Sequence, residues 1–165
     1  MPGTYMKPKA YNRHFALNLG TDASPDWAEI SVGISSRGNS FTENTEDFYY
    51  MNNKGTAETE PTNQKISRTF SGNRFIGDKA QDAVFIDRLY DLDNREAEYL
   101  EWYDNYPEGK ANGYKGKCAI TVSDDGSGDT SSRETIGFGF SINGKPVAGT
   151  VTVTEEGKIT FAEKV

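Results

Sequence analysis

Residues 135–142 read Thr-Ile-Gly-Phe-Gly-Phe-Ser-Ile, and the pair Asn143-Gly144 follows them directly. Apolar side chains alternate with small or polar ones along this run, which is typical of a β-strand with one buried face. Asn-Gly is the preferred pair for a two-residue type I′ turn, so we predict a β-hairpin about these two residues. The expected cross-strand pairs are Phe140 with Val147, Phe138 with Gly149, and Ile136 with Val151.

The end of the chain predicts a second hairpin. A three-residue loop, 155–157, places Val153 opposite Ile159 and Val151 opposite Phe161. A two-residue turn at the same place would oppose apolar and polar side chains, and a slip of one residue moves every side chain to the wrong face of a sheet. We therefore predict the three-residue loop.

Earlier segments carry the same strand signal. Apolar residues recur at every second position in Phe15–Leu19 and Ala28–Ile34, and Ile66 and Phe70 follow the same period with Arg68 between them. Lys117–Val122 is also strand-like. Residues 48–51 read Phe-Tyr-Tyr-Met and are expected to form a short aromatic strand. The chain is therefore predicted to be mostly β.

One segment, residues 79–92, predicts an amphipathic α-helix. Asp78 can cap its first turn, and Gln81 three residues later completes a variant of the capping box. The expected buried stripe consists of Phe85, Ile86, Leu89 and Leu92. We expect this helix to lie across the sheet.

Residues 37–63 flank and include the aromatic strand and are otherwise rich in Asn, Thr, Gly and Glu. We expect a long polar loop or hairpin that leaves the core and returns to it. Long excursions from a compact domain usually serve a function or are disordered.

Composition bounds the function. The 165 residues make one domain, and 18 Lys and Arg against 25 Asp and Glu give a formal charge of -7. Nine acidic residues lie between Asp82 and Glu108, against Arg88 and Arg95 alone. Proteins that grip DNA phosphates normally carry the opposite charge, so groove-reading DNA binding is not expected.

The sequence predicts neither a secretory signal nor a membrane-spanning segment, because no apolar run is long enough for either. Cys118 is the sole cysteine, which excludes an internal disulfide and a thiolate zinc site. We interpret it as a buried structural thiol of a protein made in a reducing cytosol.

We predict no catalytic, cofactor-binding or metal-binding residues and no enzymatic activity. His14 is the sole histidine, which excludes a multi-histidine site, and the spacing of Asp124, Asp125 and Asp129 does not fit a calcium loop. The aromatic and acidic side chains between residues 101 and 106 can either line a sugar site or cover core and subunit contacts. They are Glu101, Trp102, Tyr103, Asp104 and Tyr106.

Several motifs together resemble the major tail, or tail tube, proteins of bacteriophages with long non-contractile tails. These motifs are Trp27-Ala-Glu-Ile30-Ser31, Phe48-Tyr-Tyr50, Ser71-Gly72-Asn-Arg74-Phe75, Gly77-Asp78-Lys-Ala80-Gln81-Asp82 and Phe140-Ser-Ile-Asn143-Gly144-Lys-Pro146-Val-Ala-Gly149. The resemblance covers about residues 14–162.

The resemblance implies a small β-sandwich or barrel with one flanking helix. It further implies hexameric rings that stack into a tube around a tape-measure protein, bounded by tail-tip and terminator proteins. DNA would cross the lumen without specific binding on its way into the host. The protein would be made in the bacterial cytoplasm and reside in the virion tail.

Within a single domain, 1–165, the resemblance implies a flexible N-terminal arm (1–13), a loop that reaches neighbouring subunits (37–63) and C-terminal hairpins (133–162). The small, polar face of those hairpins is expected to approach the lumen. It consists of Thr135, Gly137, Gly139, Thr150, Thr152 and Thr154.

The alternative function is a glycan-binding β-sandwich module of a phage adsorption apparatus.

Overall fold

The structure, a computed structural model, describes residues 6–165. Eight strands form one antiparallel sheet in the order β2-β1-β5-β6-β7-β4-β3, and β8 also pairs with β7. The strands are β1 (Arg13–Asn18), β2 (Trp27–Glu29), β3 (Ile34–Tyr49), β4 (Ala57–Asn73), β5 (Glu96–Tyr103), β6 (Gly113–Ser127), β7 (Thr135–Val153) and β8 (Ile159–Glu163). The prediction of a mostly β chain is confirmed, and the sheet is not closed into a barrel.

Part of the predicted N-terminal arm lies outside the described residues, namely 1–5. Residues 6–9 have no regular structure, and Ala10–Asn12 form a 3-10 turn. The first strand then starts at Arg13, the last residue of the predicted arm.

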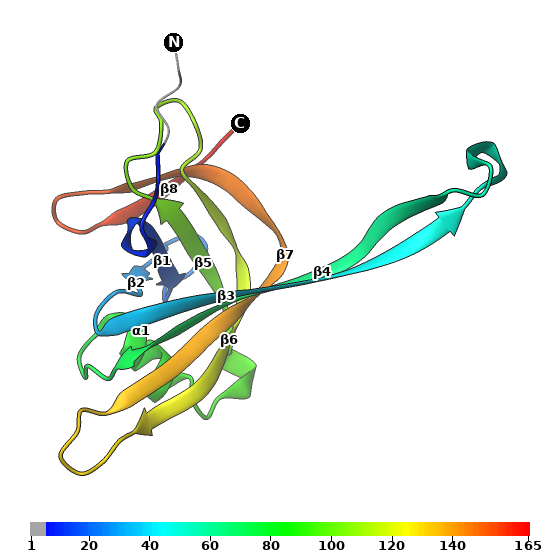
Figure 1. Cartoon of the computed structure of the whole chain (residues 1–165). Helices are drawn as coiled ribbons and strands as arrows, with labels where there is room; N and C mark the ends of the chain where they lie inside the picture. Colours follow the sequence, from blue (N-terminus) through cyan, green and yellow to red (C-terminus); the bar gives the residue numbers. More distant parts are fainter. Residues whose placement is uncertain (1–5) are drawn as a thin grey trace.

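The sheet bends because its longest strand, β7, changes partner along its length. Residues 135–141 of β7 pair with β4 and residues 149–153 pair with β8, whereas β6 pairs with residues 135–149 along the other edge of β7. Figure 1 shows this bent body, with β3 and β4 leaving it together on one side.

The main core lies inside the bend and is closed by the helical segment after β4. It consists of Phe15, Leu17, Ala28, Ile30, Phe70, Ala80, Val84, Phe85, Tyr99, Cys118, Ile120, Ile136, Phe138 and Phe140. A second cluster lies on the opposite face of β1 and β5 and consists of Ala16, Leu100, Trp102, Val151 and Ile159. Strands β1 and β5 are therefore buried on both faces.

The predicted hairpin at Asn143-Gly144 is wrong. β7 continues through it, and β6 pairs with β7 on both sides, at Cys118↔Ile142 and at Lys115↔Val147. The register shifts between these pairs, and Gly144 adopts the left-handed φ of 72°. A β-bulge of this kind bends a strand without ending it, so the turn signal marks the corner of the sheet.

Because β7 continues as one strand, the residues of the predicted small, polar face lie on both faces of the sheet. Ile136 belongs to the main core and Val151 to the second cluster, so the two residues lie on opposite faces of the sheet. Because side chains alternate, Thr150 and Thr152 share a face with Phe138, while Gly137 and Gly139 face the other way. The second predicted turn is confirmed, since Val153 pairs with Ile159 and Val151 with Phe161.

The helix is shorter than predicted. The α-helix α1 spans Lys79–Asp82, and one π-helical turn, Ala83–Asp87, ends it well before Leu92. Arg95 explains this end, because its guanidinium bonds the carbonyl oxygens of Arg88 at 2.7 Å and Leu89 at 2.5 Å and draws the chain away from the helix axis. Ile86 and Leu92 of the predicted buried stripe are 61% and 79% exposed.

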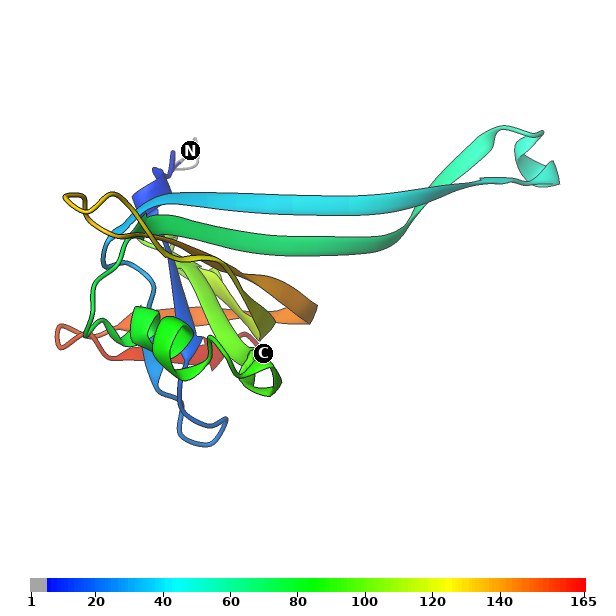
Figure 2. The ribbon, with the colours of Figure 1, turned by 90° about the horizontal axis from the view of Figure 1, so that it is seen from below.

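Residues 37–63 form the outer part of a β-hairpin rather than an irregular loop. β3 and β4 pair from Ile34↔Gly72 to Tyr49↔Ala57, and a 3-10 turn, Met51–Asn53, closes the tip. Figure 2 shows this two-stranded arm extending far beyond the body. We call the part of the hairpin formed by residues 39–66 the arm.

The strand predicted at residues 28–34 is divided in two by Gly33, which adopts a φ of 72° between β2 and β3. Residues 96–103 form strand β5, which the sequence did not predict. Among the described helices, none has the length and apolar character needed to cross a membrane.

Candidate assembly surfaces

The arm presents apolar and acidic side chains to solvent. Beyond Ser67 of β4 no strand of the body pairs with it, so both of its edges are open in the described part of the chain. Its exposed apolar side chains are Phe41 (59% exposed), Tyr49 (67%), Tyr50 (45%) and Met51 (98%). Open strand edges and exposed aromatic side chains are typical of a surface that another chain covers.

Carboxylates surround the aromatic residues of the outer arm. Glu46 lies directly opposite Glu60, and Phe48 lies opposite Glu58 on the same face. The rings of Phe48 and Tyr50 stack with their centroids 6.1 Å apart. Like charges directly opposite each other destabilise a strand pair, so this face gains from a cationic partner.

Arginines lie at the base of the arm, around one buried carboxylate. Glu101 is 6% exposed and accepts hydrogen bonds or ion pairs from Arg13 Nη2 at 3.0 Å and Arg68 Nε at 3.1 Å. The guanidinium of Arg37 lies over the ring of Phe15, 5.2 Å from its centroid. Arg13, Phe15 and Arg37 border a groove of about 390 Å³ between β1 and the start of β3, which Glu29 also lines.

His14 lies beside this groove, on the second face of β1. Its Nδ1 is 2.7 Å from Glu29 Oε1, its Nε2 is 2.6 Å from Asp104 Oδ2, and its ring stacks on Trp102. Burial lowers the pKa of His14, but the hydrogen bonds to the two carboxylates raise it by more, and the net pKa lies above its usual value. The histidine therefore links β1, β2 and the end of β5.

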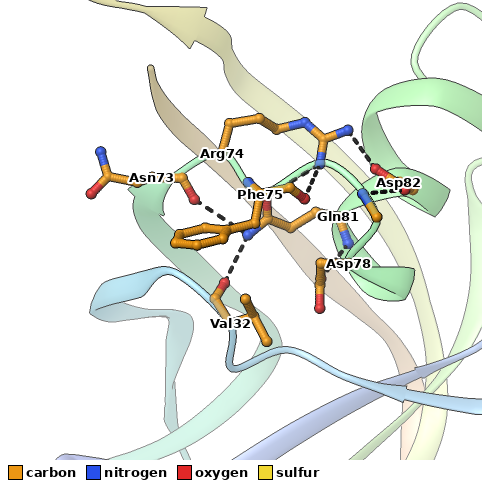
Figure 3. Close-up of polar contacts among 8 residues, drawn as sticks. Val32, Asn73, Arg74, Phe75, Asp78, Gln81 and Asp82 are labelled. Carbon is orange, nitrogen blue, oxygen red and sulfur yellow. Dashed lines mark hydrogen bonds and ion pairs between the residues drawn. The ribbon is translucent and has the colours of Figure 1, made fainter. Parts of the chain in front are cut away.

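A buried glutamine anchors the base of the arm to the helix. Gln81 is 1% exposed, and its side chain donates to the carbonyl oxygens of Val32 at 2.7 Å and Asn73 at 3.3 Å. Its Oε1 accepts from the backbone N–H of Phe75 at 2.8 Å. Figure 3 shows the amide between the start of β3 and the end of β4, so it fixes both strands of the arm relative to the helix.

The neighbours of Gln81 explain the Gly77–Asp82 motif. Asp78 caps the helix as predicted, accepting from the backbone N–H of Gln81 at 3.0 Å. Asp82 pairs with Arg74 at 2.6 Å and accepts from the N–H of Gly77 at 2.9 Å (Figure 3). The hydrogen bond from Arg74 lowers the pKa of the Asp82 carboxyl. The motif is a structural clamp.

The structure separates Glu101 from the other residues considered for a sugar site, because Trp102, Tyr103, Asp104 and Tyr106 line a groove of about 550 Å³ and Glu101 does not. Trp102 is 3% exposed and its ring is covered by His14, while Glu101 lies on the other face of β5 in its ion pairs with arginine. Tyr103 and Tyr106 stack on each other, with centroids 6.2 Å apart. A buried indole offers no platform for a sugar ring.

Two further residues considered in the sequence, Cys118 and Asp124, have structural roles. Cys118 is fully buried, and burial raises the pKa of its thiol to about 12, which agrees with the interpretation as an unreactive structural thiol. Asp124 accepts hydrogen bonds from Gly126 N at 3.0 Å and Ser127 Oγ at 2.8 Å, within its own loop. The sequence predicted the excursion of residues 37–63, but it did not reveal the strand pairing along the whole arm or the arginine groove, because neither has a local motif.

No protein-family model and no curated protein sequence matches the chain. Solved structures do match its fold. The tail of an empty gene transfer agent particle, refined with helical C6 symmetry, matches with a TM-score of 0.61 at 16% identity, over 86% of this chain and 98% of the other. The SPP1 tail tube matches with a TM-score of 0.57 at 13% identity, over 85% of this chain and 77% of the other.

A tube-terminating cap of the anti-feeding prophage also matches, with a TM-score of 0.52 at 12% identity, over 99% of this chain and 95% of the other. The chain therefore has the fold of tail tube proteins and of related tube components. The resemblance seen in the sequence motifs is confirmed at the level of the fold.

Proposed function

We propose that this chain is a structural tail tube protein, whose copies assemble as stacked hexameric rings into the tube of a phage-type tail. The observation that carries the proposal is the arm on a body with the tail tube fold. An isolated two-stranded ribbon is at best marginally stable in water, so an arm of this length gains stability when a second subunit covers it.

The charge of the chain supports a conduit for DNA. A net charge of -7 repels a polyanion, so DNA can pass along the inside of a tube without being held. In this proposal the tube surrounds a tape-measure protein, is bounded by tail-tip and terminator proteins, and delivers DNA into the host. The protein then belongs to the virion tail and carries out no catalysis.

Electron microscopy of the concentrated protein, alone and with tail-tip proteins, tests the proposal. We expect tubes with six-fold symmetry. Light scattering that shows only monomers at high concentration, even after prolonged incubation with tail-tip proteins, would contradict it.

A variant without the outer arm sharpens this test. Phe41 and Ile66 are cross-strand partners, so residues 42–65 can be replaced by the dipeptide Asn-Gly without a change in register. We expect a folded monomer that forms no tubes, with folding checked by circular dichroism. Tubes that grow at the wild-type rate would show that the arm is not the assembly element.

A further inference from the structure

The arginines that surround Glu101 at the base of the arm outnumber this one carboxylate. Arg13 and Arg68 both pair with Glu101, and Arg37 is the third guanidinium in the same cluster. In the part of the chain that the structure describes, Nη1 of Arg37 is buried and has no hydrogen-bond partner. Two guanidinium groups thus pair with Glu101, and the third, that of Arg37, has no ion-pair partner in the described part of the chain.

The charge on Arg37 is destabilised in the free subunit. Burial lowers the pKa of Arg37, and the neighbouring charges of Arg13 and Arg68 lower it further. A buried donor without a partner destabilises the folded state. The groove beside Arg37, which Tyr11, Arg13 and Ser36 also line, is open to an acidic side chain from outside.

The arm carries the complementary charge. The arm, residues 39–66, contains five carboxylates and two lysines, which are Glu43, Glu46, Asp47, Glu58, Glu60, Lys54 and Lys65. One face brings Glu46, Glu58 and Glu60 around Phe48. Carboxylates beside an aromatic ring are a favourable environment for a guanidinium group, through charge-assisted hydrogen bonds and cation–π contact.

The two surfaces cannot meet within one subunit. Glu46 follows Arg37 by nine residues along the extended strand β3, which separates them by about 30 Å. The arm points away from the body, as Figure 2 shows. A contact between the two surfaces therefore requires a second copy of the chain.

We propose that the acidic arm face of one copy, formed by Glu46, Phe48, Glu58 and Glu60, docks on the Arg13 and Arg37 groove of a neighbouring copy. The proposal rests on the assembly proposed above and names the two surfaces that meet. The contact is head-to-tail, because each copy offers one arm and one groove. Contacts of this kind propagate into rings or open-ended filaments.

Charge reversal tests the contact. We expect Arg37→Glu, and separately the double variant Glu46→Arg with Glu60→Arg, to slow tube growth at least tenfold, measured by light scattering and electron microscopy. Arg37→Glu places a carboxylate beside Arg13 and Arg68, so its monomer stays folded. Thermal melting of both proteins separates failed assembly from misfolding. Asp47→Arg is the matched control, because Asp47 lies on the opposite face of β3 from Glu46 and bonds Thr59.

Mixing the two charge-reversed proteins provides the decisive observation. In an alternating assembly the basic arm of one variant meets the acidic groove of the other, and the remaining contact is the wild-type one. We expect the mixture to form tubes at close to the wild-type rate, which neither variant reaches alone, and Asp47→Arg to assemble normally.

Two results would overturn the proposal in distinguishable ways. If the wild type and both variants form tubes at the same rate, or if the mixture fails to restore growth, the proposed contact is wrong and the tail tube function stands. If the wild type itself forms no ordered assembly, both the proposed tail tube function and the proposed contact are wrong.

Discussion

Arg68 of β4 and Glu101 of β5 form a buried ion pair, with 3.1 Å between Nε and Oε2, although β6 and β7 lie between their strands in the sheet. The contact is possible because the sheet bends at β7 and brings the two strands face to face. The pair therefore stabilises the bend and lies at the point where the arm leaves the body.

Removing the carboxylate of Glu101 leaves buried arginines without their partner. We expect Glu101→Gln to lower the free energy of unfolding by about 3 kcal/mol, because breaking one side of a buried ion pair leaves uncompensated charge. Urea denaturation measures the loss. Glu96→Gln on the same strand is the control, since Glu96 is exposed and its change should matter by less than about 0.5 kcal/mol. Equal effects of the two substitutions would contradict the prediction.

Replacing Gln81 is expected to destabilise the protein as much as replacing Glu101. Gln81→Leu keeps the volume similar but removes the partners of the Val32 carbonyl and the Phe75 N–H. We expect a loss of about 3 kcal/mol in the free energy of unfolding, because both buried groups are left unsatisfied. Gln64→Leu, at an exposed position of the arm, should leave the free energy of unfolding nearly unchanged.

Two glycines with the same backbone conformation provide a matched comparison. Gly33 and Gly55 have φ values of 72° and 74°, but a Cβ at Gly33 would lie 2.5 Å from both the Asn73 oxygen and the Phe75 ring, whereas nothing described lies within 4 Å at Gly55. Each alanine variant should lose about 1 kcal/mol from its left-handed backbone. We expect Gly33→Ala to lose about 1–3 kcal/mol more in thermal or urea denaturation, because of overpacking. Similar losses at both sites would refute the predicted clash.

The pKa of His14 makes its contribution to stability depend on pH. Because its folded-state pKa is raised above the ordinary value of about 6.5, the stabilisation is complete below that pH and is lost as the pH rises through the folded-state pKa. We expect the difference in unfolding free energy between the wild type and His14→Gln to be larger at about pH 6 than at about pH 8. NMR titration of the imidazole provides the independent measurement. A difference that grows with pH would show that the sign is wrong.

Local sequence signals predicted the structure well wherever neighbouring residues alone determine the conformation. The Asp78 cap depends on its own first turn, and the three-residue loop before Ile159 depends on the register of two adjacent strands. The hairpin predicted at Asn143-Gly144 does not form, because β6 pairs with β7 on both sides of these residues. A distant strand thus overruled a local preference.

The arm and the end of the helix also show why local sequence patterns did not predict the whole structure. Strand prediction relies on alternation between a buried and an exposed face, and the outer arm of residues 39–61 has no buried face. Its polar composition therefore looked like a loop. The helix ended early because Arg95, several residues later, binds the carbonyl oxygens of Arg88 and Leu89.

By itself the sequence determined that the chain is mostly β, acidic and of one-domain size, and it located the helix start and the last hairpin, because these depend on composition and on contacts between near neighbours. Only the tertiary structure decided that β7 bends through Gly144, that residues 37–63 project as an ordered arm, and that Arg37 lies with Arg13 and Arg68 around Glu101. These features depend on pairing between segments far apart in the chain, and the energy of such contacts leaves no local pattern.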